Sequence, residues 1–139
     1  MKFSFRNFNI EDYDEVYQLW LAEPGIKVTE ADSKDNICKL LERSPGISQV
    51  AEYQGGIVGC VLASEDTRRG YIHHLVVKSE FRHRGLGSQL MSRVEERLRN
   101  LGISKIHLFI LKNNLDVKEF YRKIGWIERE DISIMSKQL

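Results

Sequence analysis

A basic loop with two glycines, residues 82–88 with the sequence RHRGLGS, has the composition of an anion-binding site. The residues that follow recur at helical spacing, so the loop opens a helix. The first backbone N–H groups of a helix have no intrahelical partner, and the helix dipole is positive there, which favours a phosphate. Gly85 and Gly87 let the backbone approach such a ligand closely. The loop therefore predicts a phosphate-binding site, and a glycine turn before an ordinary surface helix is the alternative.

Two common kinds of phosphate loop are excluded by the same residues. A nucleotide-hydrolysing loop needs a lysine directly after its last glycine, and Ser88 follows Gly87 here. A dinucleotide fingerprint needs a third small residue where Leu90 stands. The ligand is therefore a phosphate compound of another kind, or a nucleotide bound in some other way.

Two adjacent histidines lie on the apolar stretch just before the loop, Tyr71 to Val77. This stretch predicts a buried strand, because it ends in β-branched residues. An imidazole can take a proton from an amine near neutral pH. Successive residues of a strand point to opposite faces, so only one of His73 and His74 faces a given site unless a bulge intervenes.

A second candidate motif is Asn114-x-x-Val117-x-x-x-Tyr121, followed by Gly125-Trp126. A tyrosine hydroxyl at hydrogen-bond distance can protonate or stabilise a thiolate leaving group. The alternative is that Tyr121 is a core tyrosine whose hydroxyl has a structural partner.

The two motifs together resemble the GNAT superfamily of N-acetyltransferases. The pattern Arg82-x-x-Gly85-x-Gly87 is similar to the loop with which that family binds the pyrophosphate of acetyl-CoA. The second motif departs from the family pattern at two positions: Val117 replaces the usual alanine, and Trp126 replaces the usual phenylalanine. The resemblance covers about residues 3–139. It implies an acetyl-CoA-dependent N-acetyltransferase whose acceptor is a small molecule or peptide with a primary amine. In a ternary complex, this amine attacks the thioester of acetyl-CoA directly.

The resemblance also implies roles for individual residues. Tyr121 is expected beside the cofactor sulfur as general acid, and His73 falls where several small-amine enzymes of the family carry a catalytic glutamate. Burial of His73 for packing alone is the open alternative. Trp20 and Tyr71 are expected to contact the acceptor. The expected cofactor-binding residues are Leu75, Val76, Val77, Arg82, His83, Arg84, Gly85, Leu86, Gly87, Ser88, Asn114 and Tyr121.

Length and composition predict a single domain over 1–139, with the apolar and charged fractions of a soluble protein. No apolar run reaches about 18 residues and no signal-like segment occurs, so we expect a cytoplasmic protein without a membrane span. Cys38 and Cys60 lack metal-ligand spacing, and the basic residues do not alternate with exposed aromatics. We therefore expect neither a metal nor nucleic acid as a partner. A homodimer is common for the resembled fold.

Charge is unevenly divided along the chain. Residues 1–66 hold six Lys or Arg and twelve Asp or Glu, whereas residues 67–139 hold fifteen and eight. The basic half contains the loop, as a polyanionic cofactor would favour. The acidic half would suit a cationic acceptor, although an uneven spread of solvated surface charge explains the numbers as well.

Hydrophobic periodicity predicts an α+β protein with one sheet, in the order β-α-α-β-β-β-α-β-α-β, with the last strand divisible in two. This is the order of the GNAT fold, whose mixed, mostly antiparallel sheet is flanked by helices. The expected strands cover 2–8, 47–53, 57–64, 71–77, 105–111 and 127–139, and in the last of these Ile132 and Ile134 share one side. Asp32 or Ser33 can cap the second helix, and Gly102 is expected as a left-handed cap after the third. Two rival functions stay open: a non-catalytic acyl-CoA sensor of the same fold, and a nucleotide-phosphate binder unrelated to acetyl transfer.

Overall fold

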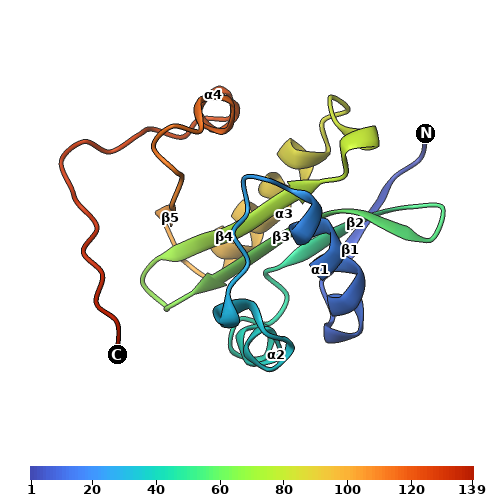
Figure 1. Cartoon of the computed structure of the whole chain (residues 1–139), viewed down its shortest axis with the longest axis horizontal. Coiled ribbons are helices and arrows are strands. Elements are labelled where there is room, and N and C mark those ends of the chain that lie inside the picture. The colour runs from blue at the N-terminus through green and yellow to red at the C-terminus, as the bar shows by residue number, and fades with distance from the viewer. The chain divides into compact units, whose positions relative to one another are not determined.

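A computed structural model describes all residues, 1–139 (Figure 1). The chain forms two compact units, Met1–Phe109 and Ile110–Leu139. The regular elements of the first unit are β1 (Ser4–Asn7), α1 (Tyr13–Ala22), α2 (Lys34–Arg43), β2 (Gln49–Tyr53), β3 (Gly56–Glu65), β4 (Gly70–Val77), α3 (Leu86–Asn100) and β5 (Ile106–Leu108). The second unit contains α4 (Leu115–Lys123). No helix is both long and apolar enough to cross a membrane.

The five strands form one sheet in the order β1-β2-β3-β4-β5. The first three pairings are antiparallel, and β4 pairs with β5 in parallel. Helices α1 and α2 cover one face of this sheet and α3 covers the other (Figure 1). The predicted α+β class and the mixed, mostly antiparallel sheet are therefore confirmed.

Helix ends follow local side-chain chemistry. The Ser33 side chain accepts a hydrogen bond from the Asn36 N–H (3.2 Å) and caps α2, one of the two caps that the sequence allows. Gly102, with φ +84°, follows the end of α3, and its N–H donates to the Arg99 carbonyl (2.9 Å). A left-handed residue at this place is the usual helix stop, so this prediction also holds.

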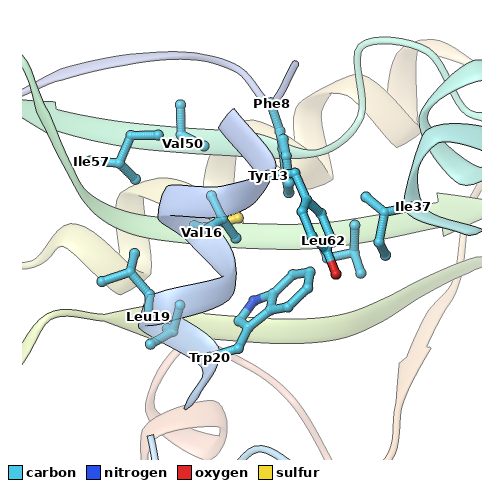
Figure 2. Close-up of a cluster of buried hydrophobic side chains, with 11 residues drawn as sticks. Phe8, Tyr13, Val16, Leu19, Trp20, Ile37, Val50, Ile57 and Leu62 are labelled. Carbon is cyan, nitrogen blue, oxygen red and sulfur yellow. The ribbon is translucent and has the colours of Figure 1, made fainter. Parts of the chain in front are cut away.

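The main core lies between the sheet and helices α1 and α2 (Figure 2). Its fully buried centre includes Val16 and Trp20 from α1, Val50 from β2 and Leu62 from β3. On the opposite face, α3 turns its own apolar stripe toward the strands. Gly59 allows close packing there, because a Cβ would lie 3.2 Å from a Leu90 methyl group and 3.3 Å from the Val76 carbonyl oxygen.

The predicted strand over 127–139 is wrong: the chain after α4 has no helix or strand. Ile132 and Ile134, whose alternation suggested one buried face, are both exposed. Alternation shows only which side chains would share a face, whereas a strand also needs a partner for its backbone groups. The strand predicted over 105–111 is reduced to Ile106–Leu108.

Candidate active site

The glycine loop lies at the N-terminus of α3, as the sequence predicts. Gly85 is the N-cap residue in the left-handed conformation (φ +78°), and His83 is also left-handed (φ +62°). The first intrahelical bond of α3 runs from the Gln89 N–H to the Gly85 carbonyl (3.1 Å). The N–H groups of residues 86–88 precede this bond and have no intrahelical acceptor. With no acidic residue in the first turn, the helix end can accept an anion.

The two arginines of the loop differ in their surroundings. The Arg82 guanidinium donates through Nε to the Val77 carbonyl (3.1 Å) and pairs with the carboxylate of Glu23, the residue that follows α1 (2.5 Å). Arg84 is exposed and has no ion pair. The positive charge that the sequence assigns to both residues is therefore partly neutralised at Arg82.

The edge of β4 that faces away from β3 is open beyond its short pairing with β5. That pairing ends at Ile72 opposite Leu108. The Lys78 N–H donates to the Val58 carbonyl (2.8 Å), so alternate residues before it turn their backbone groups to β3. Leu75 and Val77 consequently present theirs to the outer edge, where the Val77 carbonyl already accepts from Arg82.

A bulge interrupts β4 in its middle. Leu62 of β3 pairs with His74, but the next residue, Ala63, pairs with Ile72, so His73 is the extra residue. A bulge re-aims a side chain and is over-represented near active sites. Because of the bulge, the side chains of His73 and His74 no longer alternate between the two faces of the sheet, as those of adjacent strand residues otherwise do.

Both histidines consequently project to the face that α1 and α2 cover. His74 lies opposite Leu62, which belongs to the core on that face. Ser64 is two residues further along β3 and shares its face. The Ser64 hydroxyl and the His73 Nε2 are 2.7 Å apart, which places the second ring there too.

His74 is held by residues from distant parts of the chain. Its Nε2 lies 3.0 Å from Oδ1 of Asp32, and the exposed fractions of the two side chains are 16% and 12%. The Trp20 ring packs edge-on against the imidazole at 5.0 Å between centroids. The other Asp32 oxygen accepts from the Thr29 N–H (3.2 Å). Sequence reasoning considered Asp32 only as a helix cap, and nothing local links it to a histidine 42 residues away.

His73, the predicted general base, lies at the rim of the same cluster. Loss of hydration and the neighbouring His74 ring lower the pKa of His73, and the Asp32 carboxylate opposes them more weakly. A histidine whose pKa is lowered stays neutral at neutral pH and retains a lone pair. Its role as base remains a prediction.

The two residues expected to contact the acceptor are placed differently. Trp20 is fully buried beneath α1, and its indole N–H is the one buried side-chain polar atom without a partner. It can therefore shape the site only through neighbours such as His74. Tyr71 is partly exposed, and its hydroxyl donates to Asp66 (3.3 Å). A hollow of about 430 Å³ shares Asp32 with the His74 contact and is lined by Tyr13, Tyr17, Val28, Thr29, Glu30, Asp32 and Ser33.

The second unit carries the remaining predicted residues. The Asn114 side chain caps α4 by accepting from the Val117 N–H (3.4 Å). Tyr121 is buried against the rings of Phe120 and Trp126, at 5.1 and 5.4 Å between centroids. This burial raises the pKa of Tyr121. The phenol therefore remains a proton donor through the neutral and mildly alkaline range.

Comparison with known proteins identifies the family of this chain. The model of the Acetyltransferase (GNAT) family matches residues 13–126. An acetyltransferase of Pectobacterium atrosepticum is 34% identical over 134 residues, which cover 96% of this chain and 94% of that protein. An acetyltransferase of Sodalis glossinidius is 30% identical with the same coverage. The solved structure of the PaiA N-acetyltransferase of Thermoplasma acidophilum in complex with coenzyme A shares the fold, with a TM-score of 0.82 and 21% identity over 96% of this chain and 94% of that one.

Proposed function

The chain belongs to the GNAT acetyltransferase family and is an N-acetyltransferase, and from this premise we propose that it transfers acetyl from acetyl-CoA to a primary amine. The transfer is direct, within a ternary complex of enzyme, acetyl-CoA and amine. The observation that carries the proposal is the α3 N-terminus, which offers the unpaired N–H groups of residues 86–88 and no acidic side chain. The PaiA structure, which holds coenzyme A, supports the choice of ligand.

The cofactor is proposed to bind mainly through backbone groups. The N–H groups of residues 83–88 hold the pyrophosphate, which the helix dipole favours, whereas the Arg82 N–H already donates to the Ser79 carbonyl (3.4 Å). The pantetheine arm pairs with the outward groups of Leu75 and Val77 as an added strand would. Because the Val77 carbonyl already accepts a hydrogen bond from Arg82, the available partners are the N–H and carbonyl of Leu75 and the N–H of Val77.

The acceptor amine must lose a proton before it attacks. A lysine-like amine has a pKa of about 10.4, so the neutral form at pH 7 costs roughly 4–5 kcal/mol without a base. The bulge of β4 supplies two imidazoles on one face, of which the sequence favours His73. After attack on the thioester carbonyl, Tyr121 is proposed to protonate the departing sulfur, for which its raised pKa keeps the proton available.

The acceptor is proposed to carry positive charge. The hollow beside Tyr13 and Asp32 is lined by two tyrosines and two carboxylic acids, a combination that attracts cations. The acidic excess of residues 1–66 favours the same class. A small polyamine, an aminoglycoside or a peptide N-terminus all fit this description.

A screen of such amines, read by the release of free CoA thiol, tests the proposal. We expect turnover on at least one cationic amine and none without acetyl-CoA. Binding of CoA measured by calorimetry in the absence of any turnover would favour the acyl-CoA sensor. Binding of ATP but not of CoA would contradict the cofactor assignment altogether.

A further inference from the structure

We propose that His74, held by Asp32, rather than His73, is the group that takes the proton from the acceptor amine. The inference rests on the proposed function and assigns its base. It depends on the contact between His74 Nε2 and Asp32 Oδ1 (3.0 Å), on the bulge at His73, and on the position of both at the point where β4 and β5 part.

The Asp32 contact determines which nitrogen of His74 can react. A carboxylate oxygen only accepts, so Nε2 carries the hydrogen that lies between the two groups. The neutral imidazole then has its free lone pair on Nδ1. When Nδ1 takes a proton, the ring's positive charge lies beside the Asp32 carboxylate, which is its counter-ion. The pair thus combines a fixed tautomer with a counter-charge for the protonated state.

Asp32 is itself held in place by its own turn. It is the last residue of the 3₁₀ turn Glu30–Asp32, and its Oδ2 accepts from the Thr29 N–H (3.2 Å). Its backbone carbonyl accepts from the buried Tyr13 hydroxyl (2.6 Å). The edge of the Trp20 ring closes another side of the imidazole. Contacts of this kind fix a side chain to the precision that proton transfer requires.

The place of His74 along the strand suits the reaction. β4 leaves β5 after Ile72, and its open backbone edge begins at Leu75. His74 adjoins Leu75, so the proposed base lies next to the proposed start of the pantetheine track. Its partner Asp32 lines the 430 Å³ hollow that we assign to the acceptor. The base therefore lies between the two substrates' proposed positions.

His73 lacks this arrangement. Its Nε2 contacts the Ser64 hydroxyl, a neutral partner that does not favour the protonated ring as a carboxylate does. Two titratable groups lie beside His74, Asp32 from the turn before α2 and His73 on its own strand. Helix α1 presents Trp20 to it and β3 presents Leu62, neither of which carries charge.

The proposed step balances as follows. The ammonium form of the acceptor gives one proton to Nδ1 of His74, which later passes it to solvent. The neutral amine nitrogen then forms a bond to the acetyl carbon, and the carbon–sulfur bond breaks with its electron pair leaving on sulfur. The second nitrogen proton ends on that thiolate. The products are an acetamide and free CoA.

The decisive variant is His74→Gln. Its amide can still donate to Asp32, which preserves the structural hydrogen bond, but it cannot take a proton near neutral pH. We expect kcat to fall by roughly 10²–10⁴ with unchanged acetyl-CoA affinity and an unchanged melting temperature. The loss of rate on acidification that a histidine base causes should also disappear. His73→Gln, which removes the rival base, should lower kcat less than His74→Gln does.

Asp32→Asn tests the positioning role. The new amide can turn its NH₂ toward Nε2 and leave the hydrogen on Nδ1, so kcat should fall about tenfold or more. Asp35→Asn removes the same charge from the start of α2 without touching His74 and should leave kcat unchanged.

Full turnover in His74→Gln with a large loss in His73→Gln would overturn the assignment in favour of His73. Losses in both that track the melting temperature would reduce the pair to a packing role. Absence of acetyl transfer in the unaltered protein would instead contradict the proposed function, independently of the choice of histidine.

Discussion

The glycine loop and the histidine bulge contribute to one reaction but are built in opposite ways. The loop is made of consecutive residues, and its functional groups are backbone N–H groups at the start of α3. The bulge works through side chains, and His74 depends on residues 42 and 54 positions earlier, Asp32 and Trp20. A backbone site tolerates side-chain changes unless they block it, whereas a side-chain site is weakened when any one partner is changed.

This difference separates binding from chemistry. Changes to the loop should alter acetyl-CoA affinity, and changes to the bulge should alter the rate at a given occupancy. The comparison fails if changes to the loop, or changes to the bulge, alter acetyl-CoA affinity and turnover rate to the same extent.

The largest expected effect is that of Gly85→Asp. The site has room for a Cβ, whose nearest neighbour is Gln89 at 3.9 Å, and aspartate is among the residues that adopt a left-handed conformation. The carboxylate would lie beside the pyrophosphate and repel it, so calorimetry should detect no acetyl-CoA binding.

Gly102→Asp is the matched control, because Gly102 is also left-handed (φ +84°) but lies at the far end of α3 with nothing within 4 Å of its Cβ position. Equal affinities for the two variants would disprove the loop as the cofactor site.

Tyr121→Phe should have an intermediate effect on the chemistry alone. It keeps the ring against Phe120 and Trp126 and removes the hydroxyl. Turnover should fall while acetyl-CoA affinity stays within a few fold, since charge on sulfur develops in the transition state. Because burial raises the pKa of Tyr121, the phenol stays protonated between about pH 6 and 9, and the deficit should be constant over that range.

A deficit in Tyr121→Phe that vanished toward low pH would point to a different proton donor. Unchanged turnover at every pH would remove Tyr121 from the mechanism.

The smallest effects are expected from changes to the loop arginines. Small effects there would support the claim that backbone N–H groups contribute most of the acetyl-CoA affinity. Arg84→Ala should weaken acetyl-CoA binding by about 1 kcal/mol or less, as an exposed charge does. Arg82→Ala should weaken it less, because Glu23 already neutralises that guanidinium. Calorimetry at low salt would resolve the order, and the reverse order would show that Arg82 leaves Glu23 for the phosphate.

The sequence predicts the features built from consecutive residues and misses those built from distant ones. The loop and the caps at Ser33 and Gly102 depend on neighbouring residues, so they were predicted correctly. The bulge, the Ser64–His73 contact and the Asp32–His74 pair depend on how β3, β4 and the turn before α2 meet, which no local pattern contains. The absent last strand has the same cause, since strand pairing is a property of two segments.

Burial explains the other discrepancy. The family resemblance implied that Trp20 contacts the acceptor, yet its ring lies wholly within the core (Figure 2). An amphipathic pattern identifies the buried face of α1 but not which of its residues borders the site.

Backbone amide chemical shifts during a titration with CoA test the central claim most directly. If the α3 N-terminus holds the pyrophosphate, the N–H signals of Gly85, Gly87 and Ser88 should move most and saturate together. Those of Thr29 and Ser33, beside the proposed acceptor hollow, should move little. Stationary loop signals with large shifts around Thr29 would place CoA in that hollow and contradict the account.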